Sequence, residues 1–169
     1  LSEYPLDLKT IQDQTAAWLK CSHPNIAKFY GLFVVENIVW MILEFVSHGS
    51  IKQIIKFGYS HGFHDESIVA TFLSQIVNGL KYLHENQIVS GLLSKILINS
   101  DGVVKISGVG LTTSIVTSYS KRSKTLSLFG EECYNAPEVL KNENDYTPKS
   151  DIWSLGLLAI ELGTGKMPY

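Results

Sequence analysis

The sequence predicts an α+β fold, and three features of the chain lead to that prediction. Residues 26–35 and 38–45 are rich in β-branched and aromatic side chains, which is typical of two strands joined by a tight turn. Residues 66–85 carry apolar side chains at helical spacing and predict one long helix. Residues 96–106 contain an Asp-Gly turn between apolar runs and predict a short hairpin. Helices and strands do not alternate regularly, so a βαβ sheet is not expected.

The first helix and the strands after it are predicted from their apolar patterns. A helix is predicted over residues 8–20, and its apolar face would contain Leu8, Ile11, Thr15 and Leu19. The Ser-His-Pro-Asn sequence that follows ends this helix, because proline disfavours helical geometry in the residue before it. The strand over residues 38–45 is apolar almost throughout, so we expect both of its faces to be covered.

The remaining elements follow from caps and spacing. Asp65 is predicted to cap the long helix. The buried stripe of that helix would contain Ile68, Phe72, Ile76, Leu80 and Leu83, widened by Val69, Leu73 and Val77. A short helix is predicted over residues 51–56 and a short strand over residues 88–89. A final helix over residues 151–162, capped by Ser150, is apolar nearly all round and is expected at the centre of the fold.

The composition narrows the classes of protein to consider. The 169 residues include 14 Lys+Arg and 16 Asp+Glu, so there is no basic excess to bind nucleic acid through its phosphates. Apolar residues make up 45% and charged residues 18%, which excludes a disordered chain. No apolar run approaches the roughly 20 residues of a membrane span. Cys21 and Cys133 are too few for a disulfide framework, so we expect a cytoplasmic protein. Because the chain begins with Leu1, we expect a piece of a longer protein.

Five segments resemble, in the same order, the motifs of eukaryotic protein kinases. They are HPNIAKFYGLF (23–33), WMILEFVSHGSI (40–51), FLSQIVNGLKYLHENQIV (72–89), NAPEVL (135–140) and SDIWSLGLLAIELGTGKMPY (150–169). The second and fifth segments look most like those of sterile-type serine/threonine kinases. The resemblance implies a truncated, protein-kinase-like two-lobe fold of the α+β class. Residues 1–46 would form part of the small lobe and residues 47–169 part of the large lobe.

The resemblance also shows which catalytic groups are missing. Kinases hold Mg²⁺ with the Asp of Asp-Phe-Gly and the Asn of the catalytic loop, whose own Asp orients the substrate hydroxyl. Here SGVG stands at residues 107–110, so Gly108 occupies the position of the metal-binding aspartate. The catalytic loop, residues 90–95, is two residues short, and Leu92 occupies the place of the base. Gln14 replaces the helix glutamate that would pair with a lysine. No metal site is expected.

Other positions are assigned by resemblance to binding or structural roles. Leu43 would be the gatekeeper, and the backbones of Glu44 and Val46 would face adenine. Glu138 of the Ala-Pro-Glu motif would lack its usual arginine partner, which leaves a costly unpaired charge if it is buried. Asp151 would accept hydrogen bonds from the catalytic-loop backbone, a structural role.

Residues 112–127 are rich in serine and threonine and predict a loop. Another kinase could phosphorylate this loop, and the candidate acceptors are Thr112, Thr113, Ser123 and Thr125. A solvated, unmodified loop is the alternative. His61 and His64 have a spacing compatible with a helical metal site, but Gly62 lies between them and no set of four ligands is completed, so a zinc site is not expected.

Taken with the missing catalytic groups, the resemblance predicts a catalytically inactive pseudokinase that acts as a scaffold or allosteric partner in phosphorylation signalling. A protein partner is expected, such as an active kinase, with no nucleic-acid or membrane partner. No cofactor is expected. ATP and Mg²⁺ would be needed only under the first alternative, a divergent ATP-dependent serine/threonine kinase. The second alternative is a non-functional kinase fragment.

Overall fold

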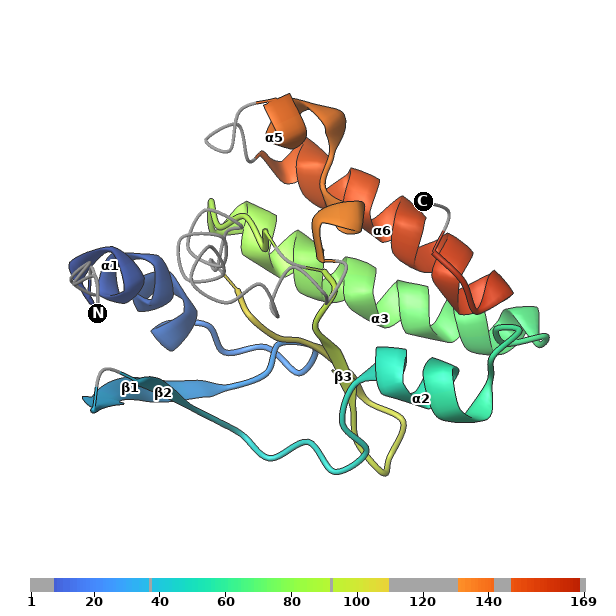
Figure 1. Ribbon diagram of the computed structural model, residues 1–169, viewed down its shortest axis with the longest axis horizontal. Coiled ribbons are helices and arrows are strands. Elements are labelled where there is room, and N and C mark those ends of the chain that lie inside the picture. Colours follow the sequence, from blue (N-terminus) through green and yellow to red (C-terminus); the bar gives the residue numbers. More distant parts are fainter. Residues whose placement is uncertain (1–7, 37, 92, 110–130, 142–146, 168–169) are drawn as a thin grey trace.

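The chain folds into helices and two small antiparallel sheets, as the α+β prediction requires. The computed structural model describes residues 8–36, 38–91, 93–109, 131–141 and 147–167 (Figure 1). The elements in order are α1 (Leu8–Leu19), β1 (Phe29–Val35), β2 (Ile38–Leu43), α2 (Ile51–Gly58), α3 (Glu66–Glu85), β3 (Ile96–Ile98), β4 (Val104–Ile106), a 3₁₀ helix (Glu131–Tyr134), α5 (Pro137–Lys141) and α6 (Pro148–Thr164).

Both predicted hairpins are confirmed. Strand β1 pairs antiparallel with β2, and β3 pairs antiparallel with β4. The first strand begins at Phe29 rather than at residue 26, because Ile26 instead forms an isolated parallel bridge with Ile106 of β4. The strand predicted over residues 88–89 is wrong, since those residues form no regular element. The bridge at Ile26 joins the β1–β2 hairpin to the part of the molecule that contains β3 and β4.

The prediction that strand β2 is covered on both faces is wrong. Ile38, Trp40 and Ile42 alternate along the strand, and each exposes about half of its side chain, with Trp40 at 53%. Among the described residues, β1 is the only strand paired with β2, so within that part of the chain one edge of β2 has no paired strand. Trp40 instead stacks on its cross-strand partner Phe33, with ring centroids 6.3 Å apart. An apolar run shows only that a strand can be buried, and the neighbouring elements decide whether it is.

Helix α1 packs against β1 through a different residue from the one predicted. Thr15 is buried as expected, but Leu19 is 51% exposed, and Trp18 is fully buried. The Trp18 indole stacks on Phe29 at 4.8 Å and donates from Nε1 to the carbonyl of Ala27 at 2.8 Å. The larger aromatic side chain therefore sets which face of the helix meets the strand. The side chains of Leu8 and Ile11 lie outside the described residues.

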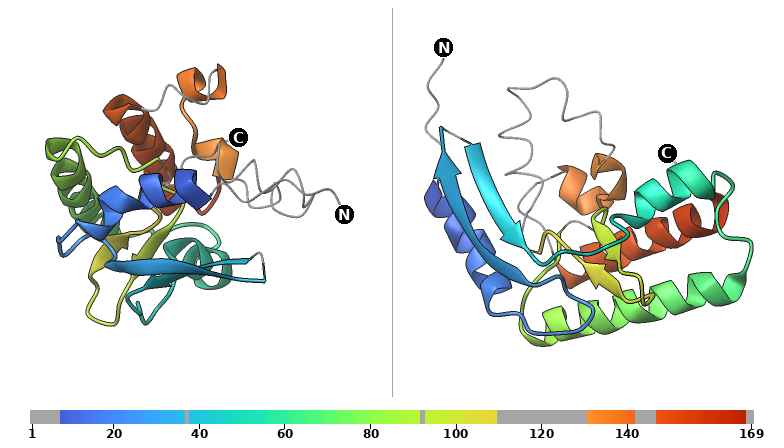
Figure 2. Two further views of the ribbon diagram at one scale, coloured as in Figure 1. Left: turned by 90° about the vertical axis from the view of Figure 1, so that its left-hand side faces the viewer. Right: turned by 90° about the horizontal axis from the view of Figure 1, so that it is seen from below.

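Helix α3 is the central helix of the larger part of the molecule. Its predicted N-cap is confirmed, since Asp65 accepts a hydrogen bond from the Ser67 backbone N–H at 2.9 Å. In the C-terminal half of the helix the predicted stripe is confirmed, because Ile76, Leu80 and Leu83 are buried. Ile68 and Val77 are exposed instead, because α3 contacts β4 and α6 on one side only. Figure 2 shows α3 and α6 running side by side.

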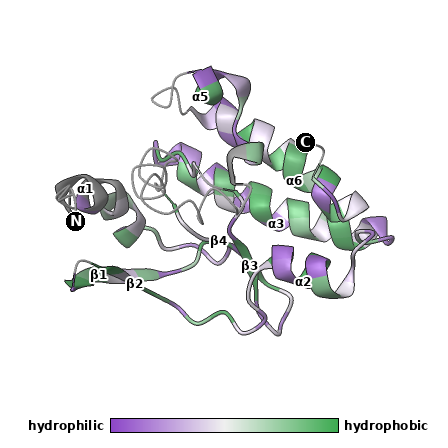
Figure 3. Cartoon of the chain, in the orientation of Figure 1, coloured by the Kyte–Doolittle hydropathy of each residue, from purple (hydrophilic) through white to green (hydrophobic). Residues whose placement is uncertain are grey.

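Helix α6 starts earlier than predicted and has one exposed face. Its N-cap is Thr147, which forms a capping box with Ser150, the residue predicted as the cap. Leu157, Leu158 and Leu162 are buried against the core. The expectation of burial all round is wrong, because the exposed large apolar residues of the helix include Ile152, Trp153 and Ile160. Figure 3 shows hydrophobic residues along much of α6, so the exposed face cannot be recognised from hydropathy alone.

Two glycines in these helices provide a matched test of the packing. In α3, a Cβ at Gly79 would lie 2.9 Å from Ile106 Cδ1 and 3.0 Å from the Asn25 carbonyl oxygen. In α6, a Cβ at the exposed Gly156 would meet nothing within 4 Å. We expect Gly79→Ala to lower the free energy of unfolding by about 1 kcal/mol, because overpacking exceeds the gain in helix propensity. We expect Gly156→Ala to raise it by about 0.5–1 kcal/mol.

Urea unfolding of both variants, followed by circular dichroism, measures these two changes. Opposite signs support the close approach of α3 to β4. A stabilised Gly79→Ala variant would contradict this close approach, because alanine can stabilise the helix only if its methyl group has room beside β4.

Candidate functional site

Asp151 connects α6 to the segment that follows α3. Its side chain is only 1% exposed. Oδ2 accepts a hydrogen bond from the Ser90 backbone N–H at 2.9 Å, and Oδ1 accepts one from the Gly91 N–H at 3.0 Å. His84 Nε2, in the last turn of α3, lies 2.7 Å from Oδ2. Three groups therefore converge on one buried carboxylate, and the backbone contacts are those that the kinase resemblance implies for this residue.

The segment held by Asp151 is the one that matches a kinase catalytic loop. Ser90 and Leu93 are fully buried, while Leu92, which stands at the place of the base, lies outside the described residues. The hydroxyls of Ser90 and Ser94 are buried and have no hydrogen-bond partner within the described part of the chain. Residues 90–95 contain no carboxylate or amide side chain, so this segment supplies neither a general base nor a carboxylate ligand.

The second catalytic position lies directly after β4. Gly108 is buried between Ser107 and Val109, and its backbone has φ +78°. The Ser107 N–H donates to the carbonyl of Lys95 at 2.9 Å, which joins this strand end to the catalytic-loop segment. The two segments that would hold magnesium in a kinase thus lie side by side here. The structure brings the positions together, but the position of the principal metal ligand carries no side chain.

The residues that the resemblance places beside adenine, Leu43, Glu44 and Val46, form the hinge between the two lobes of a kinase, and here they have contacts of their own. Leu43 ends β2, and the Glu44 N–H donates to the Lys28 carbonyl at 2.9 Å. The Glu44 carboxylate forms an ion pair with Lys105 of β4, with Oε1 and Nζ 2.7 Å apart. The carbonyl of Val46 accepts a hydrogen bond from the Gly49 N–H at 3.1 Å. Sequence reasoning missed the ion pair, because its partners are far apart in the chain and the motif that contains Glu44 assigns a role only to its backbone.

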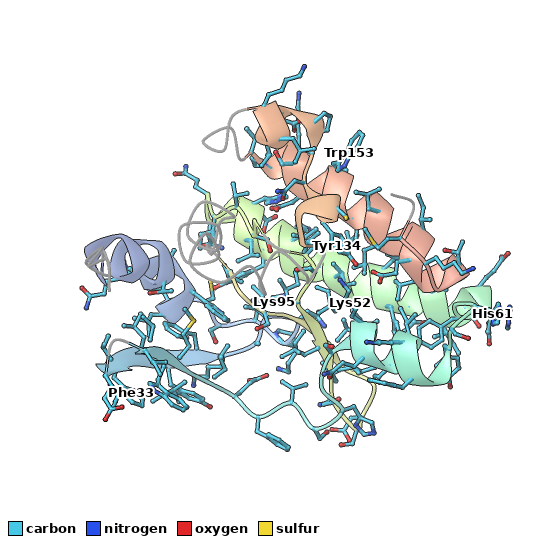
Figure 4. The ribbon with its side chains drawn as sticks, viewed as in Figure 1. Phe33, Lys52, His61, Lys95, Tyr134 and Trp153 are labelled. Carbon is cyan, nitrogen blue, oxygen red and sulfur yellow. The ribbon has the colours of Figure 1, made fainter. Side chains whose placement is uncertain are left out.

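A second pair that sequence reasoning missed anchors the segment before α5. The buried Tyr134 hydroxyl donates to the buried carboxylate of Glu161 in α6. Burial and this hydrogen bond raise the pKa of Tyr134 well above its usual range, so the hydroxyl stays protonated as a donor. Ser154 Oγ donates to the Tyr134 carbonyl at 2.7 Å. Lys52 Nζ lies 5.5 Å from the centre of the Tyr134 ring, and Figure 4 labels both residues.

The remaining predicted residues have mixed outcomes. Glu138 of α5 is half-buried and accepts a hydrogen bond from Ser150 Oγ at 3.1 Å, so a serine hydroxyl contacts its carboxylate, while the lack of its usual arginine stays a prediction. Gln14 lies on α1, but its side chain is outside the described residues. The candidate phosphorylation sites also lie outside them, namely Thr112, Thr113, Ser123 and Thr125.

A model of the protein kinase domain matches residues 3–169 of the chain. The chain belongs to the protein kinase family. It is 33% identical to germinal center kinase 3 of Caenorhabditis elegans, covering 94% of this chain and 29% of that protein. It is 32% identical to the serine/threonine-protein kinase fray2 of Dictyostelium discoideum, covering 97% of this chain and 16% of that protein. It is 36% identical to the mitogen-activated protein kinase kinase kinase MST11 of Pyricularia oryzae, covering 87% of this chain and 16% of that protein.

This kinase-family chain therefore spans less than a third of the length of these relatives. The family and the α+β kinase fold agree with the resemblance found in the sequence. The match to sterile-type kinases agrees as well, since the relatives include germinal center and fray kinases.

The family implies ATP and Mg²⁺, and the side chains at the matching positions can be tested against that ligand. Magnesium prefers carboxylate, phosphate and water oxygens in an octahedral arrangement. Gly108 offers no side-chain oxygen, and residues 90–95 offer two hydroxyls and one ammonium but no carboxylate. Across the described ranges, no group of three or more His, Cys, Asp or Glu residues could hold a metal ion. These residues do not fit magnesium-bound ATP as a kinase holds it.

Within the parts of the chain that the structure covers, no helix is long and apolar enough to cross a bilayer.

Proposed function

We propose that this kinase-family chain is a catalytically inactive domain that acts through contact with another protein, with an active protein kinase as the expected partner. The observation that carries the proposal is Gly108, which stands at the metal-ligand position beside a catalytic-loop segment without carboxylate or amide side chains. A cytoplasmic location and independence from ATP and Mg²⁺ belong to the same proposal.

The size of the expected catalytic defect supports the proposal. Loss of a general base alone costs about 10²–10⁴ in rate. Phosphoryl transfer depends on positioning and on neutralising the charge of the phosphates, and here the metal ligands are missing together with the base. These losses are not additive, because the groups act as a unit. What remains of the site is its backbone scaffold, held by Asp151.

An active serine/threonine kinase is the second candidate, because two of the relatives, fray1 and fray2 of Dictyostelium discoideum, are named as serine/threonine-protein kinases. That candidate needs magnesium ligands from elsewhere in the protein. A non-functional fragment is the third candidate, and it predicts that the protein binds no kinase.

A phosphotransfer assay separates these candidates. The full protein is incubated with radiolabelled ATP, Mg²⁺ and a general protein substrate, with and without EDTA. We expect no incorporation of label above the EDTA background. In a binding assay, we expect the purified protein to capture an active kinase and to change the phosphorylation rate of that kinase. EDTA-sensitive transfer that persists after removal of every captured protein would contradict the proposal. An inactive protein that neither captures nor modulates a kinase would leave the third candidate.

A further inference from the structure

A pocket of about 200 Å³ opens between the segment after α1, the hinge and β4. We call it the lysine pocket, and its lining is Cys21, Ser22, His23, Pro24, Ile26, Lys28, Glu44 and Lys105. It lies away from Gly108 and the catalytic-loop segment, neither of which contributes to the lining. Because one water takes about 30 Å³ of liquid volume, the pocket has room for one tetrahedral oxyanion and a few waters.

The charges of the lining favour an anion. Lys28 and Lys105 carry two positive charges and Glu44 one negative charge, which leaves +1 when His23 is neutral. Lys105 is paired with Glu44 at 2.7 Å. Lys28 has no carboxylate partner among the described residues, and its ammonium lies over the Tyr30 ring at 5.5 Å. An exposed cation–π contact is worth only about 0.5–1 kcal/mol, so Lys28 can turn to a bound anion at little cost.

The lining also contains neutral hydrogen-bond donors. His23 Nδ1 accepts a hydrogen bond from the Asn25 backbone N–H at 3.1 Å, so the proton of the neutral ring is assigned to Nε2. Burial and the nearby Lys105 ammonium lower the pKa of His23, in keeping with a positive potential in this pocket. The hydroxyl of Ser22 is a further donor in the lining.

We infer that the lysine pocket binds a phosphoryl-type oxyanion between Lys28 and Lys105. The anion would share the Lys105 ammonium with Glu44, whose backbone forms part of the hinge. Two sources have this chemistry, free inorganic phosphate and the phosphorylated side chain of a protein. The inference does not depend on the proposed function, because none of the described residues at catalytic positions lines the pocket.

Two charge-neutralising variants test the inference, because they change the charge of the pocket in opposite directions. Lys28→Gln lowers the net charge of the lining to zero, and Glu44→Gln raises it to +2. Lys81→Gln is the control, since Lys81 is an exposed lysine on α3 paired with Glu85 outside the pocket. Inorganic phosphate is titrated into the full chain at constant ionic strength, and the backbone amide NMR signals of residues 22–28 report binding.

We expect Lys28→Gln to weaken phosphate binding about ten- to a hundredfold, as for loss of a hydrogen bond to a charged group. Glu44→Gln is expected to tighten binding, and Lys81→Gln to leave it unchanged. A phosphoserine peptide is titrated in parallel. Tighter binding of the peptide than of phosphate identifies a phosphorylated protein as the source, and equal or weaker binding identifies free phosphate.

The inference is overturned if the wild-type NMR signals show no saturable shift with phosphate. It is also overturned if the Lys28→Gln, Glu44→Gln and Lys81→Gln variants bind phosphate with the same affinity. Should Glu44→Gln fail to fold because its ion pair is lost, Lys28→Gln still decides the question, since Lys28 is exposed and unpaired among the described residues. Failure here leaves the proposed function unaffected, because the phosphotransfer assay reads a different part of the molecule.

Discussion

Replacing Asp151 by alanine is expected to lower the free energy of unfolding by about 3–5 kcal/mol, the usual cost of removing one partner of a buried charged network. The carboxylate is 1% exposed and accepts hydrogen bonds from the Ser90 and Gly91 N–H groups. Alanine would leave both donors buried without an acceptor, and it would leave His84 without its carboxylate. Urea unfolding of the full chain, fitted to a two-state transition, measures the change.

Two further variants show whether the network causes this loss. Asp151→Asn keeps an acceptor oxygen but brings an amide N–H₂ towards two donors, so an intermediate loss is expected. Glu85→Ala removes an exposed carboxylate at the end of α3, whose ion pair with Lys81 is exposed, and a change within about 0.5 kcal/mol is expected. Equal losses for Asp151→Ala and Glu85→Ala would mean that the contacts of Asp151 contribute little to stability.

The same contacts explain how the catalytic-loop segment can stay in place without the side chains of a kinase catalytic loop. Asp151 holds the catalytic-loop segment through backbone N–H groups, which no substitution in that segment removes short of proline. The side chains at residues 90–95 can therefore change without releasing the segment from α6. If the proposed function is correct, this backbone scaffold supports contacts with another protein and does not support phosphoryl transfer.

Helix caps and turns were predictable from the sequence where residues close together in the chain determine them. Asp65 caps α3 through its own side chain, and the Asp-Gly turn sets the β3–β4 hairpin. The lack of a side chain at position 108 is likewise known from the sequence, because glycine has none in any fold. In each case the deciding atoms belong to the residue itself or to its near neighbours in the chain.

Features that depend on distant neighbours could not be predicted. The exposure of Trp40 and Trp153 follows from which elements cover β2 and α6, and an apolar pattern does not name those elements. The Lys105–Glu44 and Tyr134–Glu161 pairs join residues that are far apart in sequence. Charged and polar residues have many potential partners along a chain, so only the packing of the fold selects one.

Trp18→Ala is expected to lower the free energy of unfolding by about 3–5 kcal/mol, as for other large buried aromatic side chains. Trp18 is 1% exposed, stacks on Phe29 at 4.8 Å and donates to the Ala27 carbonyl at 2.8 Å. Alanine would open a cavity between α1 and β1 and leave that buried carbonyl without its donor. Because these contacts join α1 to the hairpin, we expect α1 to lose protection from amide hydrogen exchange before the rest of the chain does.

Two controls separate the contributions of packing and hydrogen bonding at Trp18. Trp18→Phe keeps an aromatic ring against Phe29 but removes the N–H donor, so a loss of about 1–3 kcal/mol is expected for the unsatisfied carbonyl. Trp40→Ala removes a tryptophan that also stacks on a phenylalanine but is 53% exposed, and a loss below about 1 kcal/mol is expected. If Trp40→Ala proved as damaging as Trp18→Ala, the exposed face of β2 would have to be buried in the full protein, and burial at the α1–β1 contact would no longer explain the difference between the two sites.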